Sequence, residues 1–500
     1  MSIWQNCAGK RKRKKNQAVT STMPDNLTIR NISSVPLELR LIERFDPHQG
    51  DGNPLGNVTS IFAKATSSFG FTNSTTRAAV PQIDSNARPF TTQDVSIHID
   101  PFSVVQTDIH ARERSDKERL RLSFEADDGR HQMYCPVPTQ ESADLFGPPN
   151  ARRRLTGIYL TQSAFVALYS SSHLNSWMQE LPHETPLSVL SIPGTHNSPT
   201  HHLAPPSVRC QAVSAWDQLQ NGVRFFDLRV QPEHPPDDPL ILVHAVFPIS
   251  LAGKKYFRDL YNDILRFLRE NPSETLLMSL KREGTGNAKD EQLSKIIKDH
   301  YVARDEGAWY TEPRIPTLGE VRGKIVLMRR FGLDDSLKGE HEGRGFGIDA
   351  SSWADNTPDN LCGSGDVRVQ DFYEVMASEN IGKKIEYCTA QFERSGCCAY
   401  DPEKAGLQAQ GQGEKTPIFV NFLSASNFWK VGTWPEKIAA KINPACVEWL
   451  CRRHMLEGDG RVKEGGWGTG VVVCDWVGLD GDWDLVRCVV GMNARLIRRG

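Results

Sequence analysis

The spacing of apolar and polar residues changes near residue 170. Between residues 27 and 166, apolar residues alternate with polar ones in short runs, as in 37–42 and 120–124, and breaks rich in Gly, Pro, Asn and Ser separate the runs. A period of two with polar loops is typical of strands that bury one face. The pattern predicts an all-β sandwich, an accessory domain over residues 25–170. No catalytic set of residues is evident in it.

After residue 170, short apolar runs alternate with stretches of helical spacing. One such stretch is 256–269, where Tyr256, Leu260, Ile264 and Leu268 recur every three or four residues. Strands alternating with helices predict an α/β fold, here a closed (β/α)8 barrel of the TIM type over residues 176–500. Helical spacing is weakest between the early strands, so the barrel is expected to be irregular there. The eight expected strands are 187–192, 224–230, 240–246, 275–281, 324–330, 367–373, 417–423 and 470–476.

Length and charge narrow the class of protein. Five hundred residues suggest two domains, and a net charge of −2 gives no whole-chain reason to expect a nucleic-acid partner. The charge is uneven, because residues 10–15 read KRKRKK within an expected disordered tail over 1–24. This basic block fits a nuclear address, an anchor for anionic lipid, or a solvated tail, and the sequence leaves these open.

The lengths of the apolar runs and the cysteine content indicate the cellular compartment of the protein. No apolar run reaches the roughly 18 residues that a membrane-spanning helix needs, and the N-terminus lacks the apolar core of a signal peptide. The 11 cysteines are odd in number and irregular in spacing, which argues against a secreted disulfide framework. We therefore expect an intracellular, cytoplasmic protein with thiols in a reducing compartment.

Polar residues follow three of the apolar runs. His196 comes directly after the turn 193–195, Arg229 ends the run that contains Asp227, and His244 ends the next run. Two histidines can act as base and acid on a phosphodiester, and an arginine can stabilise the charge that develops on phosphorus. Each residue also has a simpler interpretation, since a histidine after a strand is commonly structural and Arg229 could pair with Asp227.

Two further residues fit the same chemistry. Asp475 follows the run 471–474, where a carboxylate can hold a histidine in one tautomer and support its imidazolium form, or can simply cap a turn. Lys281 ends the run 276–280, where it could add positive charge beside a phosphate or pair with a neighbouring carboxylate.

Taken together, residues from about 176 to the C-terminus resemble the catalytic X domain of phosphatidylinositol-specific phospholipase C of the small bacterial type. The resemblance does not cover the β-rich N-terminal part. The matching segments are IPGTH at 192–196, GVRFFDLR at 222–229, ENPSET at 270–275, MSLK at 278–281, RGKIVL at 322–327, VQDFY at 369–373, NF at 421–422 and INP at 442–444.

The resemblance implies a role for each matching position. His196 takes the place of the general base that removes the proton from the inositol 2-hydroxyl, and His244 that of the acid that protonates the departing diacylglycerol oxygen. Asp475 matches the carboxylate paired with the base, and Arg229 matches the arginine that stabilises the phosphate, with Asp227 beside it. The positions expected to contact the substrate are Lys281 at the rim of the pocket and Arg330, Asp371 and Tyr373 around the inositol ring.

Two positions depart from the family pattern. Asn197 stands where the bacterial enzymes have an aspartate that supports the acid, and a neutral amide cannot raise the pKa of His244 in the same way. Ala245 replaces the glycine that usually follows the second histidine. Calcium-dependent relatives carry asparagine at position 197, but their further acidic ligands are replaced here by Arg229 and Lys281. No cofactor is therefore expected, and calcium is disfavoured.

The sequence thus predicts a metal-independent phosphodiesterase that acts on phosphatidylinositol, or on glycosylphosphatidylinositol anchors, at a membrane surface. The segments 246–249 and 428–429 are candidates for apolar contact with that membrane. Two alternatives stay open: a catalytically impaired lipid-head-group binding protein, and a metal-dependent phosphodiesterase of the glycerophosphodiester type. The sequence gives no indication of the oligomeric state.

Overall fold

The computed structural model describes most of the chain outside the basic N-terminal segment. The predicted disordered tail over 1–24 lies outside the described residues, as does Phe428. The described residues are 26–46, 83, 87–112, 118–135, 142–151, 154–171, 173–234, 237, 239–376, 380–398, 416–427, 429–453 and 468–497.

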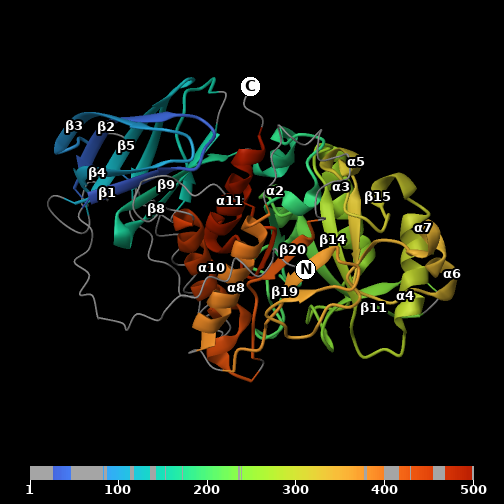
Figure 1. Ribbon diagram of the computed structural model, residues 1–500. Helices are drawn as coiled ribbons and strands as arrows, with labels where there is room; N and C mark the ends of the chain where they lie inside the picture. Colours follow the sequence, from blue (N-terminus) through green and yellow to red (C-terminus); the bar gives the residue numbers. More distant parts are fainter. Residues whose placement is uncertain are drawn as a thin grey trace, which may run out of the picture.

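The N-terminal strands form two sheets (Figure 1). One sheet has the order β4-β1-β9-β8-β7 and the other the order β3-β2-β5-β6, with β1 and β9 as a parallel pair. Side chains from both sheets share one apolar cluster that includes Leu39, Phe124 and Val166, as the alternating pattern requires. The strands are β1 (Asn26–Asn31), β2 (Leu37–Phe45), β3 (Thr91–Ile99), β4 (Val104–His110), β5 (Arg119–Ala126), β6 (Gly129–Cys135), β7 (Ser142–Asp144), β8 (Arg154–Leu160) and β9 (Phe165–Ser171).

The second part of the chain is built on a curled, mostly parallel sheet. The first parallel strand of this sheet, β10, pairs in parallel with the last, β21. From β10 the sheet continues through β11, β14 and β16, and from β21 it continues through β20 and β19. The parallel strands are β10 (Ile192–Thr195), β11 (Phe225–Pro232), β14 (Leu276–Arg282), β15 (Trp309–Tyr310), β16 (Ile325–Arg329), β17 (Ile348–Asp349), β19 (Val367–Gln370), β20 (Ile418–Phe422) and β21 (Val471–Cys474).

Three features differ from the predicted closed barrel. The segment 240–246 forms β12 (Leu240–His244), which pairs antiparallel with β11 and is followed by the short β13 (Phe247–Pro248), so it is not a barrel strand. The segment 187–192 begins as a 3-10 turn and joins the sheet only at Ile192. Among the described residues no backbone pairing joins β17 to β19, where β18 (Asn360–Leu361) pairs antiparallel with β19. The barrel is therefore open on that side.

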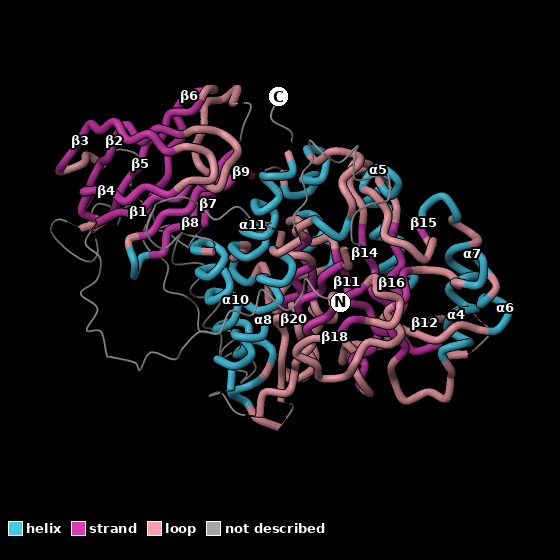
Figure 2. The backbone as a smooth tube through the Cα atoms, in the orientation of Figure 1, coloured by secondary structure: helices cyan, strands magenta, loops and turns pink. Residues whose placement is uncertain are grey.

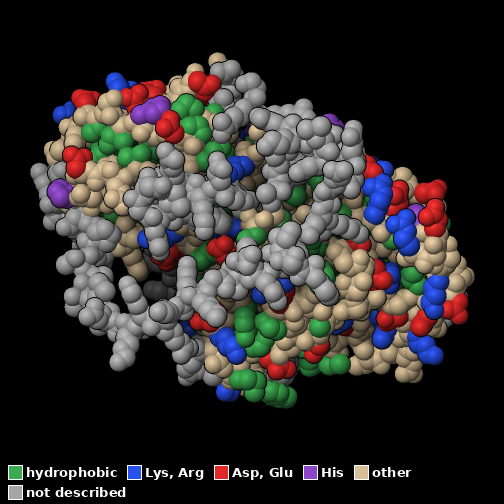
Figure 3. Space-filling model, viewed as in Figure 1, with side chains coloured by type: hydrophobic (Ala, Val, Ile, Leu, Met, Phe, Trp, Pro, Cys, Tyr) green, Lys and Arg blue, Asp and Glu red, His purple; other side chains and the backbone are tan. Residues whose placement is uncertain are grey.

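Helices cover the outside of this sheet (Figure 2). The helix predicted over 256–269 is α3, in which Leu260, Ile264 and Leu268 are buried, and Tyr256 precedes it as the N-cap. Acidic and basic side chains are interspersed at the end of the molecule that carries α6 and α7 (Figure 3). The helices are α2 (Ala215–Gln220), α3 (Phe257–Glu270), α4 (Asp290–Ile297), α5 (Leu318–Val321), α6 (Asp335–Lys338), α7 (Glu340–Gly343), α8 (Ile381–Gly396), α10 (Pro435–Arg452) and α11 (Asp484–Gly491).

The N-terminal sheets pack against the barrel through α10 and α11 (Figure 1). Tyr169 of β9 is fully buried, and a Cβ on Gly491 of α11 would lie 2.5 Å from its ring, so only glycine allows this approach. The buried Arg30 of β1 donates a hydrogen bond of 2.7 Å to the carbonyl of Cys451 at the end of α10. Apolar side chains of β8 and β9 therefore join the core of the barrel, while the cluster between the two N-terminal sheets stays separate.

Two sequence expectations concern the chain as a whole. Each of the ten cysteines in the described part of the chain is a free thiol, as the irregular spacing predicts. Of the helices in that part, none combines the length and the apolar character needed to cross a bilayer.

Candidate active site

The predicted site residues gather where the parallel strands end. His196 directly follows β10, and its backbone N–H donates to the carbonyl of Cys474 in β21. This pairing carries Asp475 to the side of the ring, where one carboxylate oxygen lies 2.9 Å from His196 Nδ1. The Asp475 side chain is only 2% exposed, and its backbone carbonyl accepts a hydrogen bond from Asn443. The expected contact between Asp475 and His196 is present, and a buried carboxylate in this position favours the tautomer with the proton on Nδ1.

His244 reaches the site from outside the parallel sheet. It ends the antiparallel strand β12, and its ring centroid lies 5.8 Å from that of His196 at an angle of 88°. Its Nδ1 lies 2.8 Å from the carbonyl oxygen of Val208 and 3.9 Å from the Sγ of Cys210. The two histidines predicted to act together are therefore brought side by side in an edge-to-face arrangement, and the loop 208–210 orients the second one.

A left-handed residue follows each of the three central side chains. Asn197 (φ 42°), Ala245 (φ 53°) and Trp476 (φ 56°) come directly after His196, His244 and Asp475. Residues other than glycine rarely adopt positive φ, and such strain is concentrated at functional sites. At position 245 this conformation explains why glycine is the usual residue there, and alanine is the smallest substitute.

Asn197 lies beside the expected base. Its Nδ2 is 3.0 Å from His196 Nε2 and 3.9 Å from Cys210 Sγ, and its backbone N–H donates to Asp227. The resemblance implied that the side chain at position 197 supports the expected acid, His244. The structure instead places Cys210 and the Val208 carbonyl beside His244.

A buried carboxylate organises the cations. Asp227 is fully buried in β11 and pairs with Arg229 through one oxygen and with Arg330 through the other, each at 3.2 Å. Burial alone would raise the pKa of Asp227, but the two guanidinium groups, His196 and the Asn197 N–H hold it well below its usual range. Arg229 thus does pair with Asp227, and this pairing fixes its position beside the histidines.

Glu283 is a member of the site that the sequence analysis missed. It lies just beyond the end of β14 and accepts hydrogen bonds from Arg229 (3.2 Å), Lys281 (2.9 Å) and the backbone N–H of Ala245 (2.8 Å). Burial opposes its ionisation, but the cations of Arg229 and Lys281 lower the pKa of Glu283 to about 2. Its position two residues after Lys281 on the same strand face was the available signal.

This pairing changes one sequence argument. Arg229 and Lys281 were expected to act as two cations that repel a divalent metal. In the structure both are paired with Glu283, and Arg229 is also paired with Asp227. Each of these two cations therefore has a carboxylate partner, so repulsion by these two residues is not a reason to exclude a cation from the site.

Two of the predicted inositol contacts, Arg330 and Asp371, adjoin the same cluster and are bridged by Trp353. Asp371 follows β19, is 8% exposed, and accepts a hydrogen bond of 3.1 Å from Trp353, whose ring lies 3.8 Å from the guanidinium carbon of Arg330. Burial raises the pKa of Asp371 despite the nearby cations of Arg330 and Arg229. The Tyr373 hydroxyl donates to Asp355 at 2.9 Å. Since β19 ends at Gln370, both Asp371 and Tyr373 stand on a loop rather than on the predicted strand.

Cys210 couples the two histidines electrostatically. Burial and Asp475 would raise the pKa of the Cys210 thiol, but the imidazole rings of His196 and His244 outweigh them and lower it to about 7. For His196, burial acts to lower the pKa, and the Asp475 carboxylate together with Cys210 raises it above the ordinary value. No motif pointed to Cys210, because only the fold of the loop brings it to the histidines.

Comparison with known sequences gives the same family as the resemblance. Residues 183–331 match the family described as phosphatidylinositol-specific phospholipase C, X domain. The match covers less than a third of the chain. The matched range holds His196, Arg229 and His244, whereas Asp371, Tyr373 and Asp475 lie beyond it.

Two bacterial relatives extend the similarity. The 1-phosphatidylinositol phosphodiesterase of Staphylococcus aureus is 27% identical over 356 residues, which are 68% of this chain and all of the relative. The 1-phosphatidylinositol phosphodiesterase of Listeria monocytogenes is 35% identical over 168 residues, which are 30% of this chain and 47% of the relative. The similarity to the first of these therefore continues beyond the X domain.

The chain is also similar to a human protein and to a solved bacterial structure. The human PI-PLC X domain-containing protein 1 is 26% identical over 219 residues, 36% of this chain and 64% of the relative. A double mutant of the phosphatidylinositol-specific phospholipase C from S. aureus has a similar fold, with a TM-score of 0.50 and 24% identity, covering 64% of this chain and 97% of that one.

Proposed function

We propose that this chain cleaves phosphatidylinositol to diacylglycerol and inositol 1,2-cyclic phosphate without a metal ion. The observation that carries the proposal is the adjacent pair of imidazoles, 5.8 Å apart between ring centroids, with the first ring contacted by Asp475. The names of the bacterial relatives, 1-phosphatidylinositol phosphodiesterase, support the substrate class.

The reaction begins at His196. With Nδ1–H donating to Asp475, Nε2 carries the lone pair that accepts the proton of the inositol 2-hydroxyl. The Asn197 amide lies 3.0 Å from this nitrogen, so the substrate hydroxyl competes with that contact. As the hydroxyl oxygen bonds to phosphorus, the Asp475 carboxylate stabilises the imidazolium that forms.

The departing oxygen requires a proton and the phosphorus requires a cation. The bond from phosphorus to the glycerol oxygen breaks, and protonated His244 gives its proton to that oxygen. Arg229 faces the charge on phosphorus, held in place by Asp227 and Glu283. Arg330, Asp371 and Tyr373 are proposed to contact the inositol ring, and Lys281, 38% exposed, lies at the rim. Glycosylphosphatidylinositol carries the same hydroxyl and phosphodiester, so the same step applies to it.

Exposed apolar side chains near the site fit a membrane-surface substrate. Val246 and Phe247 are exposed on the hairpin that follows His244. Leu251 is 64% exposed, and its backbone N–H donates to the carbonyl of Leu203. Trp429 is 87% exposed. Ile249, by contrast, is buried in the core, so the predicted contact segment ends at Pro248. We propose peripheral contact with a phosphatidylinositol membrane from a reducing, cytoplasmic compartment.

The products from phosphatidylinositol vesicles test this function. With a chelator present, phosphorus NMR is expected to show inositol 1,2-cyclic phosphate as the first water-soluble product. A non-cyclic inositol phosphate formed first would contradict the role of the 2-hydroxyl. Loss of activity on chelation would favour the metal-dependent phosphodiesterase. Vesicle binding without turnover would favour the head-group binding protein, which Asn197 and Ala245 make the second candidate.

The coupling through Cys210 predicts a shift in the pH profile. Only neutral His196 accepts the proton, so a raised pKa keeps the base inactive to higher pH, and kcat/KM should rise as the pH passes through that pKa. Replacing Cys210 by serine removes the anionic neighbour and lowers the pKa of His196. The rising limb of kcat/KM is therefore expected to move to lower pH by about 1 unit.

Cys474→Ser is the matched control for this shift. Cys474 is also buried near Asp475, but burial raises the pKa of its thiol and it donates to the Gly194 carbonyl, so it stays uncharged. Its replacement should leave the limb in place. An unchanged limb in Cys210→Ser, or one displaced to higher pH, would contradict the coupling.

A further inference from the structure

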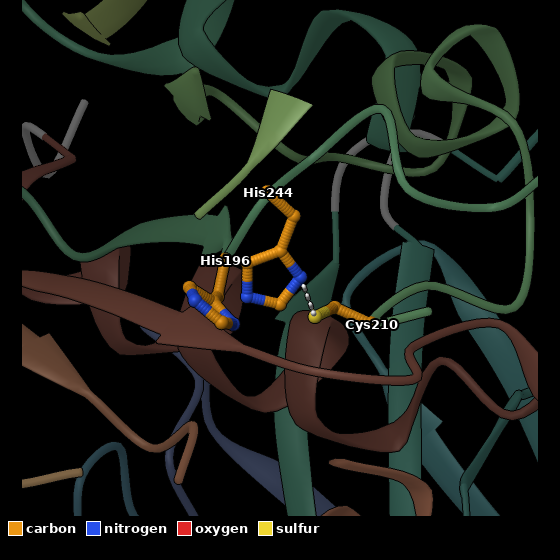
Figure 4. A group of neighbouring side chains, drawn as sticks. All are labelled: His196, Cys210 and His244. Carbon is orange, nitrogen blue, oxygen red and sulfur yellow. Dashed lines mark hydrogen bonds between the residues drawn. The ribbon is translucent and has the colours of Figure 1, made fainter. Parts of the chain in front are cut away.

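The two histidines and Cys210 form a cluster of metal-binding atoms. One nitrogen from each of His196 and His244 and the Sγ of Cys210 all lie within 4.8 Å of one another. In Figure 4 the His244 ring lies between the His196 ring and the Cys210 thiol, and a dashed line joins its Nδ1 to the sulfur, 3.9 Å away. Two nitrogens and one sulfur are ligands that zinc and other thiophilic divalent cations prefer.

The surroundings hold both rings as metal-binding imidazoles are held. His196 Nδ1 contacts the Asp475 carboxylate at 2.9 Å, and His244 Nδ1 contacts the Val208 carbonyl at 2.8 Å. When Nδ1–H donates to such an oxygen, the lone pair is on Nε2 and the ring is fixed in orientation. Cys210 is fully buried, so its sulfur is confined beside His244 rather than free to turn into solvent.

Asn197 supplies an independent indication. Its side chain is 1% exposed, and its Nδ2 points at His196 Nε2 and Cys210 Sγ. Its Oδ1 is buried without a hydrogen-bond partner among the described residues. A buried acceptor without a partner is unfavourable. Rotation of the amide would turn this oxygen toward the cluster, where it could approach a bound cation.

We propose that His196, His244 and Cys210 bind one zinc ion, or another thiophilic divalent cation, and that this ion inhibits the chain. Binding uses neutral imidazoles and the thiolate, so the protons displaced from these groups pass to the solvent. The ion occupies the nitrogens that the phosphodiester reaction needs, so cation and substrate exclude each other. This inhibition rests on the proposed function, whereas the binding itself does not. Calcium and magnesium prefer oxygen ligands and should not compete.

Cadmium is a direct probe of the binding site. Titrating Cd²⁺ into the full, chelator-treated chain should produce the ultraviolet charge-transfer band of a thiolate–cadmium bond, saturating at one ion per chain. Cys210→Ser should lose this band, whereas replacing both Cys397 and Cys398, the less buried adjacent pair, by serine should leave it. Absence of the band in the unaltered chain, or its retention in Cys210→Ser, would overturn the site.

Two further measurements separate binding from inhibition. In competition with a chromogenic chelator, Cys210→Ser and Cys210→Ala should each bind Zn²⁺ at least about 100-fold more weakly than the unaltered chain. Zn²⁺ should inhibit cleavage of phosphatidylinositol, excess chelator should restore it, and Cys210→Ser should resist the inhibition. Activation by Zn²⁺, or equal inhibition of the variant, would overturn the inhibitory role. If the chain shows no phosphodiesterase activity, the cadmium band still decides whether the site exists.

Discussion

Replacing His196 by asparagine is expected to lower kcat for phosphatidylinositol cleavage by about 1,000-fold or more. Asparagine occupies a similar volume, but its amide cannot accept the proton of the inositol 2-hydroxyl. The Asp475 carboxylate, 2.9 Å from Nδ1 in the unaltered chain, then has no imidazolium to stabilise. KM should change far less than kcat, because Arg229 and its carboxylate partners remain in place. Single-turnover kinetics on vesicles measure the chemical step.

His98→Asn is the control for this experiment. His98 lies on β3 in the N-terminal sheets with its side chain 63% exposed, and its replacement should leave kcat unchanged. A loss of less than about tenfold in His196→Asn would contradict the role of His196 as the base. A similar loss in His98→Asn would point to a general effect on folding or vesicle binding.

Replacing Asp227 by asparagine is expected to lower the free energy of unfolding by about 3 kcal/mol. Asp227 is fully buried and neutralises both Arg229 and Arg330 at 3.2 Å. The amide keeps the shape of the side chain but leaves two buried guanidinium groups with less compensation. The backbone N–H of Asn197 also donates to this carboxylate, so the turn that carries His196 should loosen and kcat should fall as well.

The pH dependence of stability gives a second signature of Asp227. Its pKa is depressed in the folded chain, so its contribution to stability is present above the pKa of the unfolded state, about 4. This contribution is lost as the pH falls below that value toward the folded pKa. Asp227→Asn should therefore lose less stability between neutral and acidic pH than the unaltered chain does.

Urea unfolding followed by tryptophan fluorescence tests both effects, with Asp335→Asn as the control. The Asp335 side chain is 95% exposed and pairs with Lys338 at the surface, so its loss should change stability by less than about 0.5 kcal/mol. Equal stability of Asp227→Asn and the unaltered chain would show that the carboxylate does not hold the two arginines.

The eight expected strands show how much of the fold the local apolar pattern predicts. Buried parallel strands read as apolar runs, and six of the eight runs become β11, β14, β16, β19, β20 and β21. The run at 240–246 has the same composition, yet it pairs antiparallel with β11 as a hairpin. An apolar run indicates that a strand is buried, but it does not indicate which strand it pairs with or whether the pairing is parallel or antiparallel. The two-residue strand β17 was too short to give any pattern.

Some of the site residues could likewise be predicted from the sequence, and others could not. The sequence by itself determined the side chains with evident chemistry at strand ends, namely His196, Arg229, His244 and Asp475, because a run that ends in a polar residue marks both burial and the edge of the sheet. It also indicated a resemblance to the family whose model residues 183–331 match. Those features are local, so the order of residues along the chain contains them.

Only the tertiary structure decided which groups touch. Cys210 lies on a loop without a motif, and it meets His244 because the loop 208–210 folds over β12. Glu283 joins Arg229, Lys281 and Ala245 from different strands, which gives both expected cations a carboxylate partner. Contacts between residues distant in sequence depend on the packing of the whole barrel. For that reason the order of residues along the chain pointed to His196, His244 and Asp475, but not to Glu283 or Cys210.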